Sequence, residues 1–287
     1  MNLLDTLAQG ILLGGLYTLF AAGLSLVFSV MRLVNLAHGD LIVLAAYLIL
    51  GLSSGLGLHP FAAVLLAAPL MFGAGWLLQT HVFNRVLGAD LLPPLLVSFG
   101  LSIVIQNALL EGFSADSRKL AAGQVEAASI PLGGLAVGVV PLLTLATAVA
   151  VILALNALFY RTALGRALRA TFDDPVTAGL MGIRPRRVFA IATGLALAVA
   201  AIAALYLGVR ANFDPSIDPA RLLYAFEAVI IGGLGSLWGT LAGGIVIGLA
   251  QAAGAAVNPE WQVLAGHLAF VAVLLVRPRG LFPRAHD

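Results

Sequence analysis

Long apolar runs separated by short polar segments form the pattern along this chain. Eight runs approach or exceed the length of a membrane span, at residues 7–31, 41–58, 61–78, 91–110, 135–160, 188–209, 222–257 and 261–276. A bilayer core about 30 Å thick requires about 20 apolar residues in a helix. Run length therefore predicts transmembrane helices, which periodicity alone would not distinguish from the buried helices of a soluble domain.

One long polar run interrupts this pattern at residues 161–187. It holds six arginines and two aspartates, a net charge of +4, so the positive-inside rule predicts that it is cytoplasmic. The tail after the last apolar run is expected on the same side because of Arg277, Arg279 and Arg284. The loops at 111–134 and 210–221 have no basic excess, which fits the outer side. Counting five spans back from the polar run places Met1 outside.

The apolar run at 222–257 is predicted to be two helices. Its 36 residues exceed one tilted helix, and the sequence Gly-Gly-Leu-Gly-Ser at 232–236 breaks it. Only three apolar runs separate the polar run at 161–187 from the tail after 276, and both of these are expected inside. An odd number of crossings cannot bring the chain back to the side from which it started. A helix that enters from outside and returns after the glycine turn restores the count. We therefore expect one all-α polytopic membrane domain over 1–287, with eight or nine segments including a re-entrant pair.

Composition agrees with an integral membrane protein. Hydrophobic residues make up 61% of the 287 positions and charged residues 10%, whereas soluble domains carry about 25% charged residues. The sequence has no cysteine, so disulfides and thiolate metal sites are excluded. The net charge of +2 comes from loops between spans and does not favour a nucleic acid partner. The first apolar run follows an acidic residue without a basic one and is expected to remain as an uncleaved span.

The motifs of several enzyme classes are missing. The only lysine, Lys119, lacks the preceding glycines of a P-loop, so any use of ATP requires another subunit. Neither H-E-x-x-H nor G-x-S-x-G occurs. An intramembrane enzyme would need a nucleophile beside His38 and Asp40, and none is present. A secondary transporter or channel acting alone stays open as an alternative, with only Asp40 and Glu227 as ion-coupling carboxylates.

A short helix is predicted within the polar run, at 175–181. Asp174 suits the N-cap, Pro175 the first helical position, and Gly182 a left-handed stop. Val176 and Leu180 are four residues apart and share one face, which nothing else in the chain is evidently placed to cover. Such an apolar face fits a groove on a partner. The alternative is a loop that only anchors topology, with its arginines near lipid headgroups.

Polar and glycine residues next to the apolar runs are candidates for a translocation path. The sequence Asn35-Leu-Ala-His-Gly-Asp40 either lines the path, because ionisable groups at membrane depth usually serve transport, or forms a cytoplasmic turn in water. Glu227 either faces a water-filled cavity or, as we favour, reaches the outer surface or pairs with an arginine. The full candidate set is Asn35, His38, Asp40, Glu227, Gly232, Gly233, Gly235 and Ser236.

Glycines after the predicted break recur at intervals of four. One series is Gly235, Gly239 and Gly243, and the other is Gly244 and Gly248. Small residues at this spacing allow helix backbones to approach closely inside a membrane. We therefore expect close helix packing along this run.

Five segments together resemble the H-type permease subunit of the branched-chain amino acid (LIV-type) ABC importers. They are VMRLVNLAHGD at 30–40, GRALRA at 165–170, DPVTAGLMGI at 174–183, VIIGGLGS at 229–236 and RPRGL at 277–281. The segments follow the order and spacing of that family from the first span to the tail. The sequence departs from the broader importer loop signature by lacking an acidic residue at 176–178 and by having Arg184-Pro185 after the loop.

The resemblance implies a type II-like ABC importer permease of the bacterial inner membrane. Its implied partners are a second homologous permease in a heterodimer or homodimer, two ATP-binding subunits, a periplasmic substrate-binding protein and membrane lipid. No cofactor is implied in this chain, because ATP would be bound by the partners. The implied substrates are branched-chain or other small amino acids, and related permeases carry urea or short amides. The implied ATPase-coupling residues are Asp174, Pro175, Val176, Ala178, Leu180, Met181 and Gly182.

Overall fold

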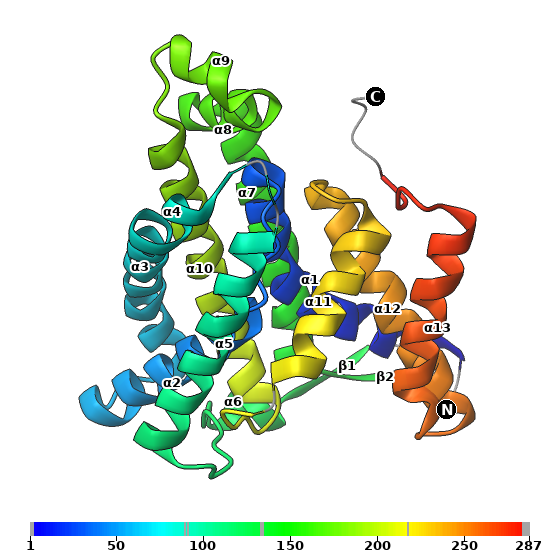
Figure 1. Ribbon diagram of the computed structural model, residues 1–287. Helices are drawn as coiled ribbons and strands as arrows, with labels where there is room; N and C mark the ends of the chain where they lie inside the picture. The colour runs from blue at the N-terminus through cyan, green and yellow to red at the C-terminus, as the bar shows by residue number, and fades with distance from the viewer. Residues whose placement is uncertain (1–2, 89, 91, 133–134, 217, 283–287) are drawn as a thin grey trace.

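The protein is a bundle of long helices in the computed structural model, which describes residues 3–88, 90, 92–132, 135–216 and 218–282 (Figure 1). Within these residues, seven helices are long and apolar enough to cross a membrane, and two shorter apolar helical segments are Leu222–Gly232 and Trp261–Val276. Together these seven long and two shorter apolar segments equal in number the upper end of the predicted range.

The elements follow the predicted runs closely. In order they are α1 (Leu3–Met31), α2 (His38–Leu56), α3 (Pro60–Leu78) with a π-helical turn (Gln79–Phe83) and α4 (Asn84–Val86), α5 (Leu92–Phe113), α6 (Gln124–Ala127), β1 (Ser129–Leu132), β2 (Leu135–Gly138), α7 (Val139–Arg161), α8 (Ala163–Asp173), α9 (Pro175–Leu180), α10 (Pro185–Arg210), α11 (Asp218–Gly232), α12 (Leu237–Val257) and α13 (Trp261–Val276). The predicted break of the run at 222–257 is confirmed, since α11 and α12 are separate helices.

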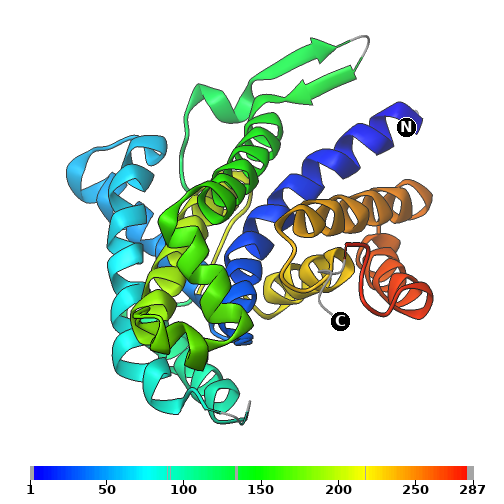
Figure 2. The same ribbon diagram turned by 90° about the horizontal axis from the view of Figure 1, so that it is seen from above.

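A short β-hairpin accompanies the helices and was not predicted. Strands β1 and β2 pair antiparallel, with Ser129 opposite Gly138 and Ile130 opposite Val137. The span predicted at 135–160 therefore begins later, at Val139. Gly138 has extended backbone angles, and the alternating sequence before it suits a strand better than a helix. In Figure 2 the hairpin projects beyond the bundle.

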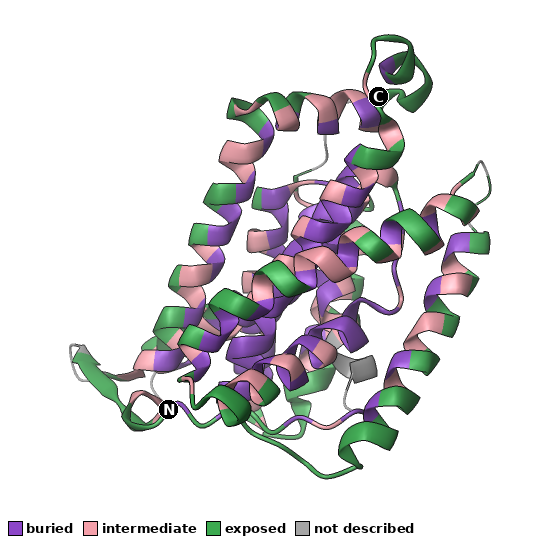
Figure 3. Ribbon diagram, turned by 90° about the vertical axis from the view of Figure 1, so that its left-hand side faces the viewer, coloured by how far each residue is buried: buried purple, intermediate pink, exposed green. Residues whose placement is uncertain are grey.

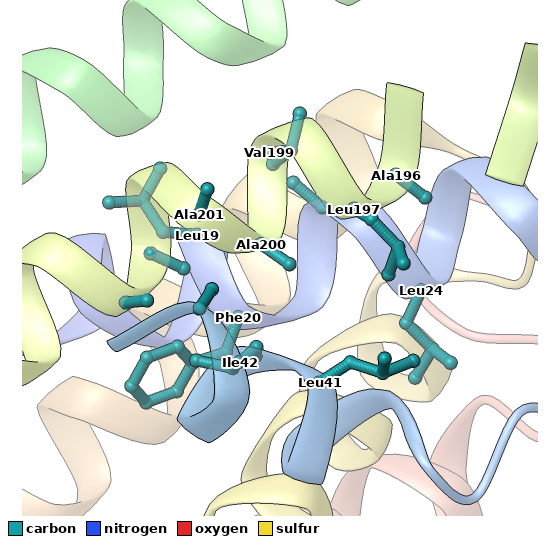
Figure 4. Close-up of a cluster of buried hydrophobic side chains, with 14 of the residues drawn as sticks. Leu19, Phe20, Leu24, Leu41, Ile42, Ala196, Leu197, Val199, Ala200 and Ala201 are labelled. Atoms are coloured by element: carbon teal, nitrogen blue, oxygen red, sulfur yellow. The ribbon is translucent and has the colours of Figure 1, made fainter. Parts of the chain in front are cut away.

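Helices α1 and α10 form the centre of the bundle. In their most apolar stretches 83% and 72% of residues are buried, against 22% for α5 at the periphery. Figure 3 shows this concentration of buried positions in the middle of the bundle. Figure 4 shows the core where α1, α2 and α10 meet, with Phe20, Ile42 and Leu197 among its side chains. Because a membrane supplies no hydrophobic drive between helices, this centre depends on close packing.

The glycine series of α12 packs against two neighbours, which confirms the expected close approach. A Cβ on Gly244 would lie 2.5 Å from the Thr18 hydroxyl, and one on Gly14 would lie 2.6 Å from the Ile245 Cα. On the other face, Gly243 meets the backbone of Ala228 in α11. Glycine at these positions thus lets α12 lie against α1 and α11 at once.

Backbone pairing shows which loops lie at the same end of the bundle. Arg118 and Phe213 exchange two backbone hydrogen bonds of 2.8 Å, joining the two loops that were both predicted outside. The tail reaches the turn between α11 and α12, where Leu281 N donates to Ile231 O at 2.8 Å. The first pairing agrees with the prediction that the loops at 111–134 and 210–221 lie on the same side. Met1 and Arg284, used in the orientation argument, lie outside the described residues.

Candidate functional site

The helix α9 forms the tip of an arm at one end of the bundle (Figure 1). It runs from Pro175 to Leu180, and the Asp174 carboxylate accepts hydrogen bonds from the backbone N–H groups of Val176 and Thr177 at 2.9 and 3.1 Å. Gly182 follows with φ of +86°. The predicted cap and stop are confirmed, and the helix is one residue shorter than expected.

The apolar face of α9 is uncovered in the chain. Val176 is 73% exposed, Leu180 83% and Met181 80%, whereas Ala178 is buried and fixes the helix to the arm. Three exposed apolar side chains on a six-residue helix and its C-cap, Met181, would be unfavourable in water. The face therefore has the character of a contact surface for another molecule.

Asp174 is electrostatically adapted to its capping role. Hydrogen bonds from the Thr177 hydroxyl and from the Thr177 and Val176 backbone lower the pKa of this carboxyl below its usual value. The depressed pKa means that the cap stabilises α9 at pH values above the unfolded pKa of aspartate. The stabilisation is lost as the pH falls through the lower folded value.

The helix α8, which supports α9, was missed by the sequence analysis. The Thr162 hydroxyl caps it by accepting from Gly165 N at 2.9 Å, and it buries Gly165, Leu168 and Thr171 against its neighbours. The Arg169 guanidinium donates to the Phe159 carbonyl of α7, which fixes α8 to that helix. A threonine three residues before the glycine, followed by apolar positions in helical register, was the available signal.

The segment from Asn35 to Asp40 lies inside the bundle. Asn35 is 3% exposed, and His38 and Asp40 are 1% exposed each. The alternative of a cytoplasmic turn in water is therefore wrong. The reason is tertiary: after α1 ends, the chain turns back into the bundle, and Leu36 N donates to the Ser98 hydroxyl of α5 at 3.1 Å.

The helix α2 consequently begins beside the middle of α1. His38 Nε2 lies 3.2 Å from the Phe20 carbonyl oxygen, and since a carbonyl only accepts, the ring donates from this nitrogen. Phe20 precedes Met31 by eleven residues, so it lies roughly 16 Å from the end of α1. Irregular backbone at such depth occurs where it is buried in protein or lines a cavity.

Glu227 belongs to a polar cluster between α11 and its neighbours. Its side chain is 3% exposed, and its Oε1 lies 2.5 Å from Nδ1 of His267 in α13. The Tyr224 ring stacks on His267 and also contacts Tyr17 of α1, with ring centroids 5.8 and 5.0 Å apart. Tyr17 donates to Gln251 of α12 at 2.6 Å. The favoured expectation is thus corrected: Glu227 is buried and pairs with a histidine, not an arginine, because α13 packs over it.

The glycine turn at 232–236 lies beside a different part of α1 from the start of α2. Gly233 and Gly235 have φ of +100° and +86°, and the Ser236 hydroxyl caps α12 by accepting from Gly239 N at 3.1 Å. Ser29 of α1 donates to Gly235 O at 3.1 Å. Since nine residues separate Ser29 from Phe20, the turn and the start of α2 lie roughly 14 Å apart along α1.

Comparison with known proteins identifies the family. Residues 6–276 match the family described as "Branched-chain amino acid transport system / permease component". The chain belongs to this permease family. It is therefore a multi-pass membrane permease, and the predicted fold class is confirmed.

The permease has relatives that align over almost its whole length. The high-affinity branched-chain amino acid transport system permease protein BraD of Pseudomonas aeruginosa is 29% identical, covering 98% of this chain and 96% of the relative. The high-affinity branched-chain amino acid transport system permease protein LivH of Escherichia coli is also 29% identical, with the same coverage. A solved structure, PsaBC from Streptococcus pneumoniae in complex with a Fab, matches with a TM-score of 0.47 and 16% identity, covering 96% of this permease and 92% of that chain.

The site residues of the permease fall into separate groups. Asn35, His38 and Asp40 lie at the start of α2, where His38 contacts Phe20 of α1. Glu227 lies at a similar level along α1, because Tyr224, one turn before it, contacts Tyr17, which is within one turn of Phe20. The turn at 232–236 forms a second group nearer the arm. The α9 residues form a third group outside the bundle. Within the described residues, no cluster of three or more histidine, aspartate or glutamate side chains could hold a metal ion.

Proposed function

We propose that this permease is half of the membrane passage of an ATP-driven importer for branched-chain or other small amino acids. Separate ATP-binding subunits would energise it, a second homologous permease would complete the passage, and a periplasmic binding protein would deliver substrate. The substrate class rests on the relatives, whose names specify branched-chain amino acids. The partial match to LivM of Escherichia coli, 27% identical over 43% of this chain, supports a homologous second permease.

The exposed apolar face of α9 is the observation that carries the proposal. A chain without a nucleotide-binding motif needs a surface through which an external motor acts, and α9 has the exposure, cap and position for this role. Docking in a groove on an ATP-binding subunit would cover Val176, Leu180 and Met181. ATP binding would then favour one of two arrangements of the bundle through its different affinity for each.

The proposed orientation places the arm in the cytoplasm and the N-terminus outside. The arginines of the segment 161–187 support this direction. The joined loops around Arg118 and Phe213 would then face the periplasm of a bacterial inner membrane, where the binding protein would dock. The β-hairpin lies toward the same end (Figure 1).

The proposed path combines the groups beside the middle of α1 with the glycine turn. His38, Asp40 and Glu227 are ionisable and buried at membrane depth, which is expensive and typical of transport pathways. The irregular segment between α1 and α2 and the break between α11 and α12 both bring backbone polar groups into the bundle, as transporters do at their binding sites. The path would run from the group around Asn35 toward Gly233 and Ser236.

The test replaces Leu180 by aspartate in the assembled transporter. Full burial of a leucine side chain is worth about 2 kcal/mol, so we expect a roughly thirtyfold weaker association of the arm with the ATP-binding subunit. Amino acid uptake and substrate-stimulated ATPase activity should both fall, while membrane insertion is unchanged. Leu56→Asp is the matched control, because Leu56 is 62% exposed at the far end of α2. Normal uptake and ATPase stimulation in Leu180→Asp would refute the coupling role.

A second experiment separates the proposal from a transporter that acts alone. The purified permease in liposomes should take up no amino acid under an imposed proton or sodium gradient. Uptake without ATP-binding subunits, lost on Asp40→Asn or Glu227→Gln, would instead favour the secondary transporter.

A further inference from the structure

Arg32 has a backbone conformation that arginine seldom adopts. Its φ is +52°, and Ser114 is the one other non-glycine residue with positive φ in the described part of the chain. Arg32 N donates to Phe28 O at 3.1 Å, so this residue ends α1 in the left-handed conformation for which glycine or asparagine is favoured. An arginine that adopts this unfavourable backbone conformation suggests a role for its side chain.

The Arg32 side chain contacts the arm that carries α9. Its guanidinium carbon lies 5.0 Å from the centroid of the Phe172 ring, a cation–π contact. Phe172 belongs to α8 and stands two residues before Asp174, which caps α9. The contact therefore joins the end of α1 to the last turn before the proposed motor contact.

On its other side, Arg32 begins the buried segment that leads to the start of α2. The chain runs from Arg32 through Leu33 and Asn35, both 3% exposed, to His38 beside the middle of α1. Five peptide bonds separate Arg32 from Ala37, the residue before α2. A displacement of Arg32 thus acts directly on the segment that holds the polar group of the proposed path.

The structure leaves room for this segment to move. A cavity of about 530 Å³ is lined by Arg32, Leu33 and Val34 and, from other parts of the chain, by Leu87 and Pro94. Close-packed interiors resist displacement, whereas a segment beside a cavity of this size has space to shift. The arm is joined to α7, because the Arg169 guanidinium donates to the Phe159 carbonyl, so the arm and the end of α7 would move together.

We propose that Arg32 and Phe172 are positioning residues that transmit movement of the α8–α9 arm to the buried segment before α2. This inference rests on the proposed function, since it assumes that α9 is the motor contact. Arg32 would act through its cation–π contact with Phe172, without contacting the substrate. Loss of the contact should leave the motor able to bind and hydrolyse ATP but weaken its response to substrate.

The test compares Arg32→Met and Phe172→Leu in the assembled transporter. Each removes the cation–π contact and keeps side-chain length or apolar bulk. Because such a contact is worth a small multiple of thermal energy, we expect the ratio of substrate-stimulated to basal ATPase activity to fall about two- to fivefold. Basal ATPase activity and subunit assembly should stay unchanged. Phe172→Tyr should restore the ratio, which a general packing defect would not allow.

Tyr160→Leu is the matched control. It removes a second cation–π contact of the same 5.0 Å length, between Tyr160 of α7 and Arg169 of α8, which does not involve α1. This variant should keep the stimulated ratio. If Arg32→Met lowers the ratio and Phe172→Leu does not, Arg32 acts as a topology anchor and the link is refuted. If Leu180→Asp uncouples the transporter while both link variants are normal, only the link fails; if Leu180→Asp is also normal, the proposed function fails.

Discussion

Replacing His267 by leucine should destabilise the permease far more than replacing Glu227 by glutamine. His267 is the hydrogen-bond partner of Glu227, at 2.5 Å, and the second carboxylate oxygen of Glu227 is buried without a partner among the described residues. His267→Leu would therefore leave both oxygens of a buried carboxyl group unpaired. Glu227→Gln keeps an acceptor for the His267 ring and removes the buried charge.

The magnitudes follow from this asymmetry. Breaking a buried pair by removing one partner costs about 3–5 kcal/mol, and a charged side chain at the centre of a membrane helix costs about 3 kcal/mol. Because the His267 side chain is 34% exposed, we expect the lower value, about 3 kcal/mol, for His267→Leu. Glu227→Gln should cost within about 1 kcal/mol. The double variant should cost less than His267→Leu alone, because it leaves no buried charge.

The assay is reversible unfolding in mixed micelles by titration with sodium dodecyl sulfate, read as a free energy for each variant. His81→Leu is the matched control, since His81 is exposed and its ring lies 3.1 Å from the Leu77 carbonyl oxygen one turn away; it should change stability by about 0.5 kcal/mol at most. Strict additivity of the two substitutions, or a His267→Leu variant as stable as the wild type, would refute the reasoning.

Two further predictions concern packing and capping. Gly248→Ala should cost about 2 kcal/mol in the same titration, because the new methyl group would meet the backbone of Gly10 and Gly14, whereas Gly55→Ala has open space and should be neutral or stabilising. Asp174→Ala should speed hydrogen exchange at the amides that the cap protects, and in the wild type this protection should be kept at neutral pH and lost as the pH falls through the depressed pKa of Asp174. The second prediction is checked by amide hydrogen exchange, measured by mass spectrometry at several pH values in the wild type, Asp174→Ala and Asp174→Asn. Equal exchange rates in the wild type and Asp174→Ala at pH 7 would contradict it.

The membrane-spanning architecture could be predicted because its signals are local. A run of about 20 apolar residues is a helix across a bilayer wherever it occurs, since lipid cannot satisfy backbone hydrogen bonds. The break at 232–236 was predictable from length, parity and glycine, and α11 and α12 confirm it. The capped helix α9 was also predictable, because Asp174, Pro175 and Gly182 define both of its ends within one short segment.

The positions of the polar site residues depended on contacts between distant parts of the chain. Asn35 to Asp40 has the composition of a loop, and only its packing against Ser98 and Phe20 places it inside the bundle. Glu227 could not be paired from sequence, because His267 lies forty residues away on another helix. Residue patterns set by backbone hydrogen bonding and hydropathy therefore determined the helices and their breaks. Tertiary packing alone decided which polar groups are buried and what they contact, because burial depends on neighbours that local sequence does not specify.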